Sequence, residues 1–187
     1  MFNIVLLEPE IPANTGNIGR TCLITQSRLH LVEPMGFRLS DKYIKRSGMD
    51  YWKDVDYTVY DSWRDFCEKH SRDLFTQESC QGEDRAGKAA LWMATTKAEK
   101  NYCDAEFKDG DYIMFGKESA GIPEEILIEN RSSCIRIPMA KGMRSLNLSN
   151  SAAIILYEAL RQNSFPGLER SGKLHRLSWP DAGSDMP

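Results

Sequence analysis

Short runs of apolar residues alternate along the chain with segments in which apolar residues recur every three to four positions. The short runs are typical of buried strands and cover Asn3–Leu7, Arg28–Val32, Val55–Tyr60, Ala90–Ala94, Tyr112–Phe115 and Cys134–Ile137. Helical or loop segments separate them, so strands and helices alternate. This order predicts an α/β fold with a mainly parallel sheet flanked by helices.

The clearest helical pattern covers Ser149–Gln162, where Ala152, Leu156 and Leu160 lie on one apolar stripe. Any Ser or Asn within Ser145–Asn150 can cap its first turn, and the pattern does not choose among them. Two further helix starts are indicated. Asp61–Asp65 fits a capping box that opens a helix to about His70. Pro123 suits the first position of another helix.

The segment Asn14–Arg20 contains Gly16 and Gly19, and we expect a loop that leads into a helix running to about Ser27. Two interpretations remain open for this loop. Its backbone N–H groups could bind a phosphate, or it could be a tight turn before a capped helix. The spacing is G-x-x-G rather than G-x-G-x-x-G, so the dinucleotide-binding fingerprint is absent.

Polar groups collect after three of the predicted strands. Thr95 follows Ala94, Gly116 follows Phe115, and the loop Met139–Arg144 follows Ile137 with two cations, Lys141 and Arg144. Open α/β sheets place ligands outside the carboxyl ends of their strands. We therefore expect these three strand ends to converge on one crevice.

Composition narrows the class of protein. The chain has 187 residues, 41% hydrophobic and 27% charged, which predicts one domain over residues 1–167 and a polar, mobile tail over 168–187. The net charge of −3 excludes a globally basic nucleic-acid binder. Five cysteines form no C-x-x-C pair, and no secretory signal or membrane-spanning run is present. These features favour a cytoplasmic protein.

Three segments also resemble known sequence motifs. They are EPEIPANTGNIGRTC at 8–22, FGKESAGIP at 115–123, and IPM…RSLNLSN…YEALRQ within 137–162. Together they resemble the motifs of the SPOUT class of RNA methyltransferases. The resemblance is closest to the small tRNA ribose 2′-O-methyltransferases that act on the wobble nucleotide. It covers roughly Met1–Gly167, with the motifs in the right order and each after a predicted strand.

The resemblance implies an activity and a cofactor. S-adenosylmethionine would donate a methyl group to the ribose 2′-hydroxyl of cytidine or modified uridine 34 of tRNA, leaving S-adenosylhomocysteine, without a metal. It also implies a C-terminal trefoil knot that holds the cofactor. We expect the cofactor to contact the strand-end residues and the knot loop, namely Ala94, Thr95, Gly116, Glu118, Ile137, Met139, Ser145 and Leu146.

The resemblance further assigns catalysis to Arg20, Ser145 and Asn147. A guanidinium is effectively always protonated, so we interpret Arg20 as a clamp on a phosphate and the developing oxyanion rather than as a general base. The three histidines lie in a strand, at a helix end and in the tail, so no residue is assigned as the proton acceptor. The residues expected to bind RNA are the cations Arg20, Lys42, Lys45, Arg46, Lys141 and Arg144.

Several alternatives remain. The cluster Lys42, Lys45 and Arg46 could be a solvated helix face instead of an RNA contact. The substrate could be another tRNA or rRNA nucleotide, or the chain could be a non-catalytic RNA-binding relative. The helix Ser149–Gln162 is apolar around much of its circumference, which predicts a homodimer. In the resembling family this helix packs on a partner subunit, whose site Arg20 would complete.

Overall fold

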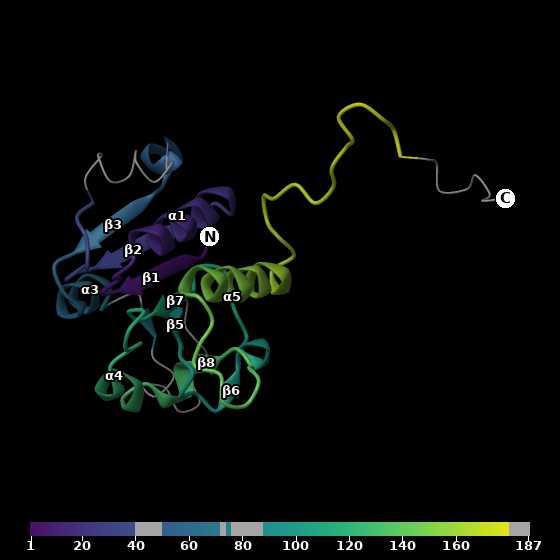
Figure 1. Ribbon diagram of the computed structural model, residues 1–187. Helices are drawn as coiled ribbons and strands as arrows, with labels where there is room; N and C mark the ends of the chain where they lie inside the picture. Colours follow the sequence, from purple (N-terminus) through teal and green to yellow (C-terminus); the bar gives the residue numbers. More distant parts are fainter. Residues whose placement is uncertain (40–49, 72–73, 76–87, 180–187) are drawn as a thin grey trace.

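The computed structural model describes residues 1–39, 50–71, 74–75 and 88–179 (Figure 1). Within them, all paired strands run parallel, in the order β3-β2-β1-β7-β5-β8-β6, with β4 also pairing with β5. The predicted α/β class and parallel sheet are thus confirmed. The strands are β1 Asn3–Leu7, β2 Arg28–Val32, β3 Tyr57–Tyr60, β4 Leu74–Phe75, β5 Ala89–Ala94, β6 Lys100–Asn101, β7 Tyr112–Phe115 and β8 Cys134–Arg136.

Helices cover both faces of this sheet. The α-helices of the described residues are α1 Pro12–Ile24, α3 Trp63–His70, α4 Glu124–Ile128 and α5 Leu148–Gln162, and the short 3₁₀ helices are η1 Asp50–Asp54, η3 Tyr102–Asp104 and η4 Arg131–Ser133. Helices α1 and α5 share one apolar core with the sheet, and α3 and α4 share another. None of the described helices is long and apolar enough to cross a membrane.

The side chains of β1 point alternately into the two apolar cores on either face of the sheet. Ile4 and Leu6 pack in the core of α1 and α5, whereas Val5 and Leu7 pack in the core of α3 and α4. All four side chains are buried. A parallel strand covered on both faces must be apolar at every position, and such a run is easy to recognise in the sequence.

The segment Asn14–Arg20 differs from the expectation. It is not a loop, because helix α1 begins at Pro12 and continues to Ile24. Proline presets the backbone for a first helical position, and Gly19 serves a close contact. A Cβ atom at Gly19 would lie 2.6 Å from the Trp52 ring of η1. Both loop interpretations of Asn14–Arg20, the phosphate-binding loop and the tight turn before a capped helix, are therefore wrong.

The other helix starts follow their local signals more closely. Ser62 caps α3 by accepting a hydrogen bond from the Asp65 N–H at 3.2 Å, as the capping box predicts. Helix α4 begins at Glu124, so Pro123 is its cap rather than its first residue. Asn147 caps α5, which resolves the choice that the sequence left open.

The sheet register brings the predicted strand ends together. Ala94 at the end of β5 lies opposite Phe115 at the end of β7 and opposite Ile135 in β8. The amino end of α5 follows the β8 loop at the same edge. The expected convergence of three strand ends is therefore confirmed.

Candidate active site

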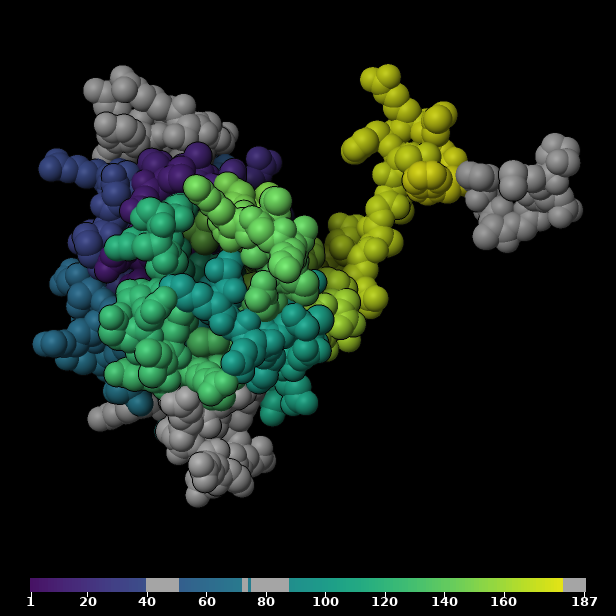
Figure 2. All heavy atoms as spheres, turned by 60° about the horizontal axis from the view of Figure 1, so that its bottom comes forward, coloured from purple at the N-terminus to yellow at the C-terminus, as the bar shows by residue number. Residues whose placement is uncertain are grey.

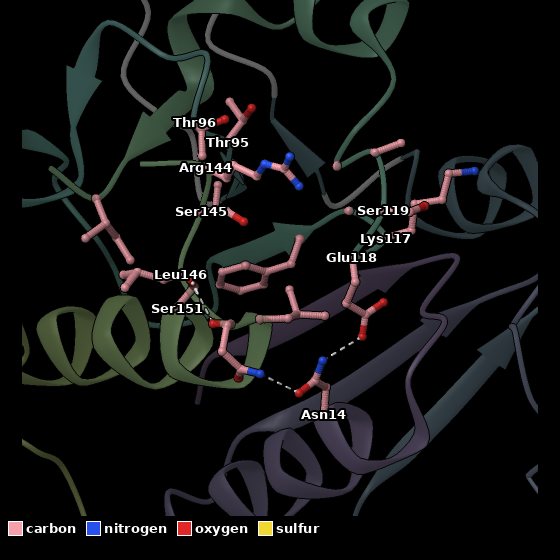
Figure 3. Close-up of a pocket in the computed structure, with 18 of the residues that line it drawn as sticks. Asn14, Thr95, Thr96, Lys117, Glu118, Ser119, Arg144, Ser145, Leu146 and Ser151 are labelled. Carbon is pink, nitrogen blue, oxygen red and sulfur yellow. Dashed lines mark hydrogen bonds between the residues drawn. The ribbon is translucent and has the colours of Figure 1, made fainter. Parts of the chain in front are cut away.

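A cavity of about 690 Å³ lies at this edge of the sheet. All eight residues expected to contact a cofactor line it, together with Asn14, Arg144 and Asn147. Figure 3 shows Thr95, Thr96, Arg144 and Ser145 on one side of the cavity and Lys117, Glu118 and Ser119 on the other. Figure 2 views the molecule after a turn that brings the lower side of Figure 1 forward, with the strand-end loops in teal and green. Concave sites of this size suit a small ligand.

The loop after β7 folds back tightly on itself at Gly116. Its turn is closed by a hydrogen bond from the Gly121 N–H to the Lys117 carbonyl at 2.7 Å, and Gly121 has a φ of 74°. A Cβ atom at Gly116 would lie 2.1 Å from the Gly121 carbonyl carbon. No side chain fits there unless this backbone moves. Glycine at 116 therefore sets the shape of one cavity wall.

Asn14 joins the cavity walls through its amide. Its Nδ2 donates to the Glu118 carboxylate at 2.9 Å, and its Oδ1 accepts from Asn147 Nδ2 at 2.9 Å (Figure 3). The Glu118 carboxylate also accepts from the N–H groups of Glu10 at 2.8 Å and Ile11 at 3.3 Å. Helix α1 has no local side-chain cap, so Glu118 holds the chain at its start from a distant loop.

Asn147 is equally engaged. Its Oδ1 accepts from the N–H groups of Ser149 and Asn150, which is the capping arrangement, and from the Ser149 hydroxyl. One hydrogen of its Nδ2 is donated to Asn14, and because Asn147 is exposed, the second N–H of that amide can still reach a ligand in the cavity, so its expected role in catalysis stays a prediction. Asn147 positions the start of α5 and the cavity loop, and both Asn147 and Ser145 are exposed in the cavity lining.

Two more contacts join the loops after β1 and β7. Lys117 Nζ lies 2.8 Å from the Glu8 carboxylate. The Glu10 carboxylate accepts from both the N–H and the hydroxyl of Ser119, at 2.9 and 2.8 Å. The hydrogen bond from the Ser119 backbone lowers the pKa of Glu10 below its usual range, so this carboxyl is ionised at neutral pH.

Free cations border the cavity. Arg144 lines it and Lys141 is exposed on the same loop, and within the described residues neither forms an ion pair. Exposed, unpaired cations beside a ligand-sized cavity can accept the phosphates of an RNA strand. The cluster Lys42, Lys45 and Arg46 lies outside the described residues.

Arg20 is exposed on α1 and does not line the cavity. Its guanidinium carbon lies 5.5 Å from the centroid of the Tyr51 ring in η1. The Tyr51 hydroxyl in turn donates to the Gly16 carbonyl at 3.0 Å. Arg20 is thus set on the surface, and its expected role in catalysis stays a prediction.

No histidine of the described residues lines this cavity. His30 is buried at the sheet, where Nδ1 lies 2.8 Å from the Tyr60 hydroxyl, and that hydroxyl lies 2.8 Å from His70 Nε2. Burial lowers the pKa of His30 to about 3. In the part of the chain that the structure describes, no cluster of three or more His, Cys, Asp or Glu could hold a metal.

Asn14 belongs to the first quoted motif, but its role is not visible in the sequence. No local pattern marks it, because its two partners are more than 100 residues away. Lys117 and Ser119 were also not assigned, although they adjoin Gly116 and Glu118. Lys117 and Ser119 contact Glu8 and Glu10, and these residues come together only when β1 and β7 pair in the folded sheet.

The cavity fits an adenosine-bearing methyl donor. Ala94, Phe115, Ile135 and Ile137 give it an apolar lining near the strand ends, and the tight Gly116 turn leaves a wall without a side chain. Thr95, Ser145 and the backbone of the strand ends offer polar groups. An adenine ring requires such an apolar slot with a few polar groups, and none of this requires a metal.

Fold and cavity together define an α/β protein with a ligand site at the carboxyl ends of parallel strands. Comparison with known proteins gives its family: residues 1–157 match the model of the SpoU rRNA methylase family. The chain belongs to this family.

Proteins that are similar over most of this chain have names that are more specific than that of the family. The tRNA (cytidine(34)-2′-O)-methyltransferase of Methylovorus glucosotrophus is 44% identical over 89% of this chain and 99% of its own. The enzyme of the same name from Saccharophagus degradans is also 44% identical, over 89% of this chain and 99% of its own.

Solved structures agree with this family. One that concerns 2′-OH methylation of C/U34 on tRNA has a TM-score of 0.75 and 37% identity, covering 88% of this chain and 97% of the other. AviRb from Streptomyces viridochromogenes, solved with AdoMet, shares the fold at a TM-score of 0.69 and 22% identity. That match covers 87% of this chain and 57% of AviRb. At this identity the match shows a shared fold, in which AviRb holds AdoMet.

Proposed function

We propose that this chain transfers a methyl group from S-adenosylmethionine to the ribose 2′-hydroxyl of the wobble nucleotide, cytidine or modified uridine 34, of tRNA. The observation that carries the proposal is the cavity at the strand ends, lined by all eight expected cofactor contacts. The names of relatives matched over nearly their whole length support the substrate. A cytoplasmic location suits a tRNA substrate, and a trefoil knot around the 137–147 loop belongs to the same proposal.

Bound S-adenosylmethionine supplies an electrophilic methyl group, and the residues of this chain then present a ribose hydroxyl to it. Ser145 is exposed in the cavity wall and can orient that hydroxyl (Figure 3). Arg144 and Lys141 hold phosphates near the mouth. Arg20 stabilises the charge that develops on the attacking oxygen, which a fixed guanidinium can do without losing a proton.

A second copy of the chain would bring Arg20 to a cavity. Ile24 is 58% exposed one turn beyond Arg20, and Ile154 and Tyr157 of the neighbouring helix α5 are 37% and 44% exposed. Apolar side chains on two adjacent helices suit a homodimer interface. We propose that such a dimer places Arg20 at the partner subunit's cavity. Light scattering at micromolar concentration would test it, because a monomer contradicts the proposal.

The activity is tested with labelled S-adenosylmethionine and a tRNA transcript, followed by mapping of the methylated nucleotide. We expect label at position 34 only. The matched control is the same tRNA with a 2′-deoxy nucleotide at position 34, which lacks the acceptor and should remain unlabelled. Label on an rRNA fragment but not on tRNA would overturn the choice of substrate.

Variants separate the roles of the proposed residues. Arg20→Ala should slow methyl transfer by roughly 10²–10³-fold and leave cofactor affinity nearly unchanged. Ser145→Ala should also lower the affinity for the cofactor, because Ser145 lines the cavity. Calorimetry with S-adenosylmethionine measures the cofactor affinity of each variant independently of methyl transfer. An Arg20→Ala variant that turns over at the wild-type rate would contradict the assignment.

A further inference from the structure

The chain turns sharply after α5. Ser164, Phe165 and Gly167 all have positive φ angles, of 61°, 52° and 73°. Phe165 and Leu168 pack against the core of α1 and α5. The Gln26 side chain donates to the Gly167 carbonyl at 3.5 Å. The turn is thus fixed to the body of the protein, and it determines where the following residues start.

The residues 169–179, here called the basic arm, leave the body beyond this turn. Every one of them is exposed, and none belongs to a helix or strand. Figures 1 and 2 show the arm in yellow, standing away from the sheet and its helices. Eleven residues at about 3.3 Å each can reach roughly 36 Å. The arm can therefore contact a large ligand that the body alone does not cover.

The arm differs from the rest of the molecule in the sign of its net charge. The arm contains three cations, Arg170, Lys173 and Arg176, against one carboxylate, Glu169, in a chain of net charge −3. Within the described residues, neither Lys173 nor Arg176 has an ion pair, and Arg170 lies 5.9 Å from the Phe165 ring centroid. The arm ends with Trp179, which is 68% exposed. Asp181 and Asp185 follow outside the described residues.

We propose that the basic arm is a second RNA contact, in which Lys173 and Arg176 bind phosphates of the substrate and Trp179 stacks on an unpaired base. This rests on the proposed RNA substrate. An acidic body repels a polyanion, so cations that project beyond that body add to the phosphate contacts proposed for Lys141 and Arg144. Exposed aromatic side chains next to cations are the usual means of holding bases that are not paired. A membrane or a second copy would instead require a continuous apolar face. Leu174 and Leu177 are 38% and 77% exposed, but they alternate with polar residues in a segment that forms no helix or strand.

The arm starts at the far end of α5 from the cavity. Fifteen residues of helix separate Asn147 from that end, about 22 Å. In the structure the arm also extends away from the body at that end (Figure 1), so its cations contact RNA away from the reacting nucleotide, where phosphate contacts position the substrate without taking part in chemistry. Their loss should raise the KM for RNA and leave the turnover number at saturating RNA unchanged.

The first test compares two variants of equal charge change. Lys173→Ala with Arg176→Ala removes two arm cations, and Arg64→Ala with Lys108→Ala removes two exposed cations elsewhere. The affinity for the tRNA transcript is measured as a function of salt concentration for both double variants and for the full wild-type chain. The arm variant should bind on the order of ten-fold more weakly in 0.1 M salt, and its slope of log affinity against log salt should be smaller by about 1.5. The matched control should keep the wild-type slope.

Trp179→Ala provides the second readout, with an expected loss of RNA affinity of about five-fold or more and an unchanged salt slope. The proposal is overturned if the arm variant and its control have the same salt slope. It is also overturned if the arm variant changes the oligomeric state but not RNA affinity. Methylation by the wild-type chain is scored separately. If the wild-type chain methylates tRNA but the arm substitutions do not change RNA affinity, only the proposed role of the arm is refuted. If the wild-type chain does not methylate tRNA, the proposed function is refuted.

Discussion

Asn14→Asp should disrupt the junction between α1 and the cavity loop. The substitution keeps the shape of the side chain but replaces the Nδ2 donor with an oxygen. That oxygen would face the Glu118 carboxylate, which now accepts from Asn14 at 2.9 Å. The bond from Asn147 to the other oxygen can persist. The change therefore isolates one contact, and it turns an attraction into a repulsion between two carboxylates.

The expected cost follows from this geometry. A hydrogen bond to a charged group contributes about 1.5–3 kcal/mol, and two facing carboxylates add a repulsion that protonation of one of them limits. An acidic residue in the first turn of a helix recovers about 0.3–1 kcal/mol through the helix dipole. Together these give a loss of about 3 kcal/mol in the free energy of unfolding. For a chain of this size that corresponds to roughly 6–12 °C in Tm.

Thermal and urea unfolding measure this loss. Asn17→Asp is the matched control, because Asn17 is exposed on the same helix and should change stability little. Combining Asn14→Asp with Glu118→Gln restores a donor opposite the introduced carboxylate and should recover at least about 1.5 kcal/mol as coupling energy. If Asn14→Asp costs no more than Asn17→Asp, or if the two changes at 14 and 118 simply add, the junction described here is wrong.

Two further predictions concern other parts of the molecule. Because burial lowers the pKa of His30 to about 3, the unfolded chain takes up a proton below its own value near 6.5 while the folded chain does not. The stability from neutral His30 is therefore present above pH 6.5 and falls as pH drops toward 3. Between pH 6.5 and 4.5 the wild type should lose about 2.3 kcal/mol more than His30→Gln in urea unfolding; equal slopes would refute this. Gly116→Ala should weaken S-adenosylmethionine at least about ten-fold by calorimetry, because its Cβ meets backbone at 2.1 Å, whereas Gly172→Ala has open space and should bind normally.

The central strands could be predicted well because they are buried on both faces. The limits of β1, β2 and β7 match the apolar runs residue for residue. The strands β4 and β6 were missed, since two residues carry no periodicity. At the sheet edge the ligand site could also be predicted, because parallel strand ends must meet there.

The start of α1 could not be predicted because its determinants are distant. Small polar residues and glycines between Pro12 and Arg20 are typical of a loop. They are tolerated in a helix here because Glu118, 108 residues away from Glu10, accepts the N–H groups at its start, and because Gly19 admits the Trp52 ring. Tertiary contacts of this kind override local propensity.

The same distant contacts connect the two parts of the proposed mechanism. Asn14 is tied to both cavity loops, through Glu118 and through Asn147, and it lies six residues before Arg20 on one rigid helix. Six residues advance a helix by about 9 Å, so the position of Arg20 is fixed relative to the cavity walls. A shift of these walls on cofactor binding would therefore move Arg20 with them, and in the proposed dimer this would change its position at the partner subunit's cavity. For this reason we expect substitutions at Asn14 to affect methyl transfer through Arg20 as well as through the cavity itself.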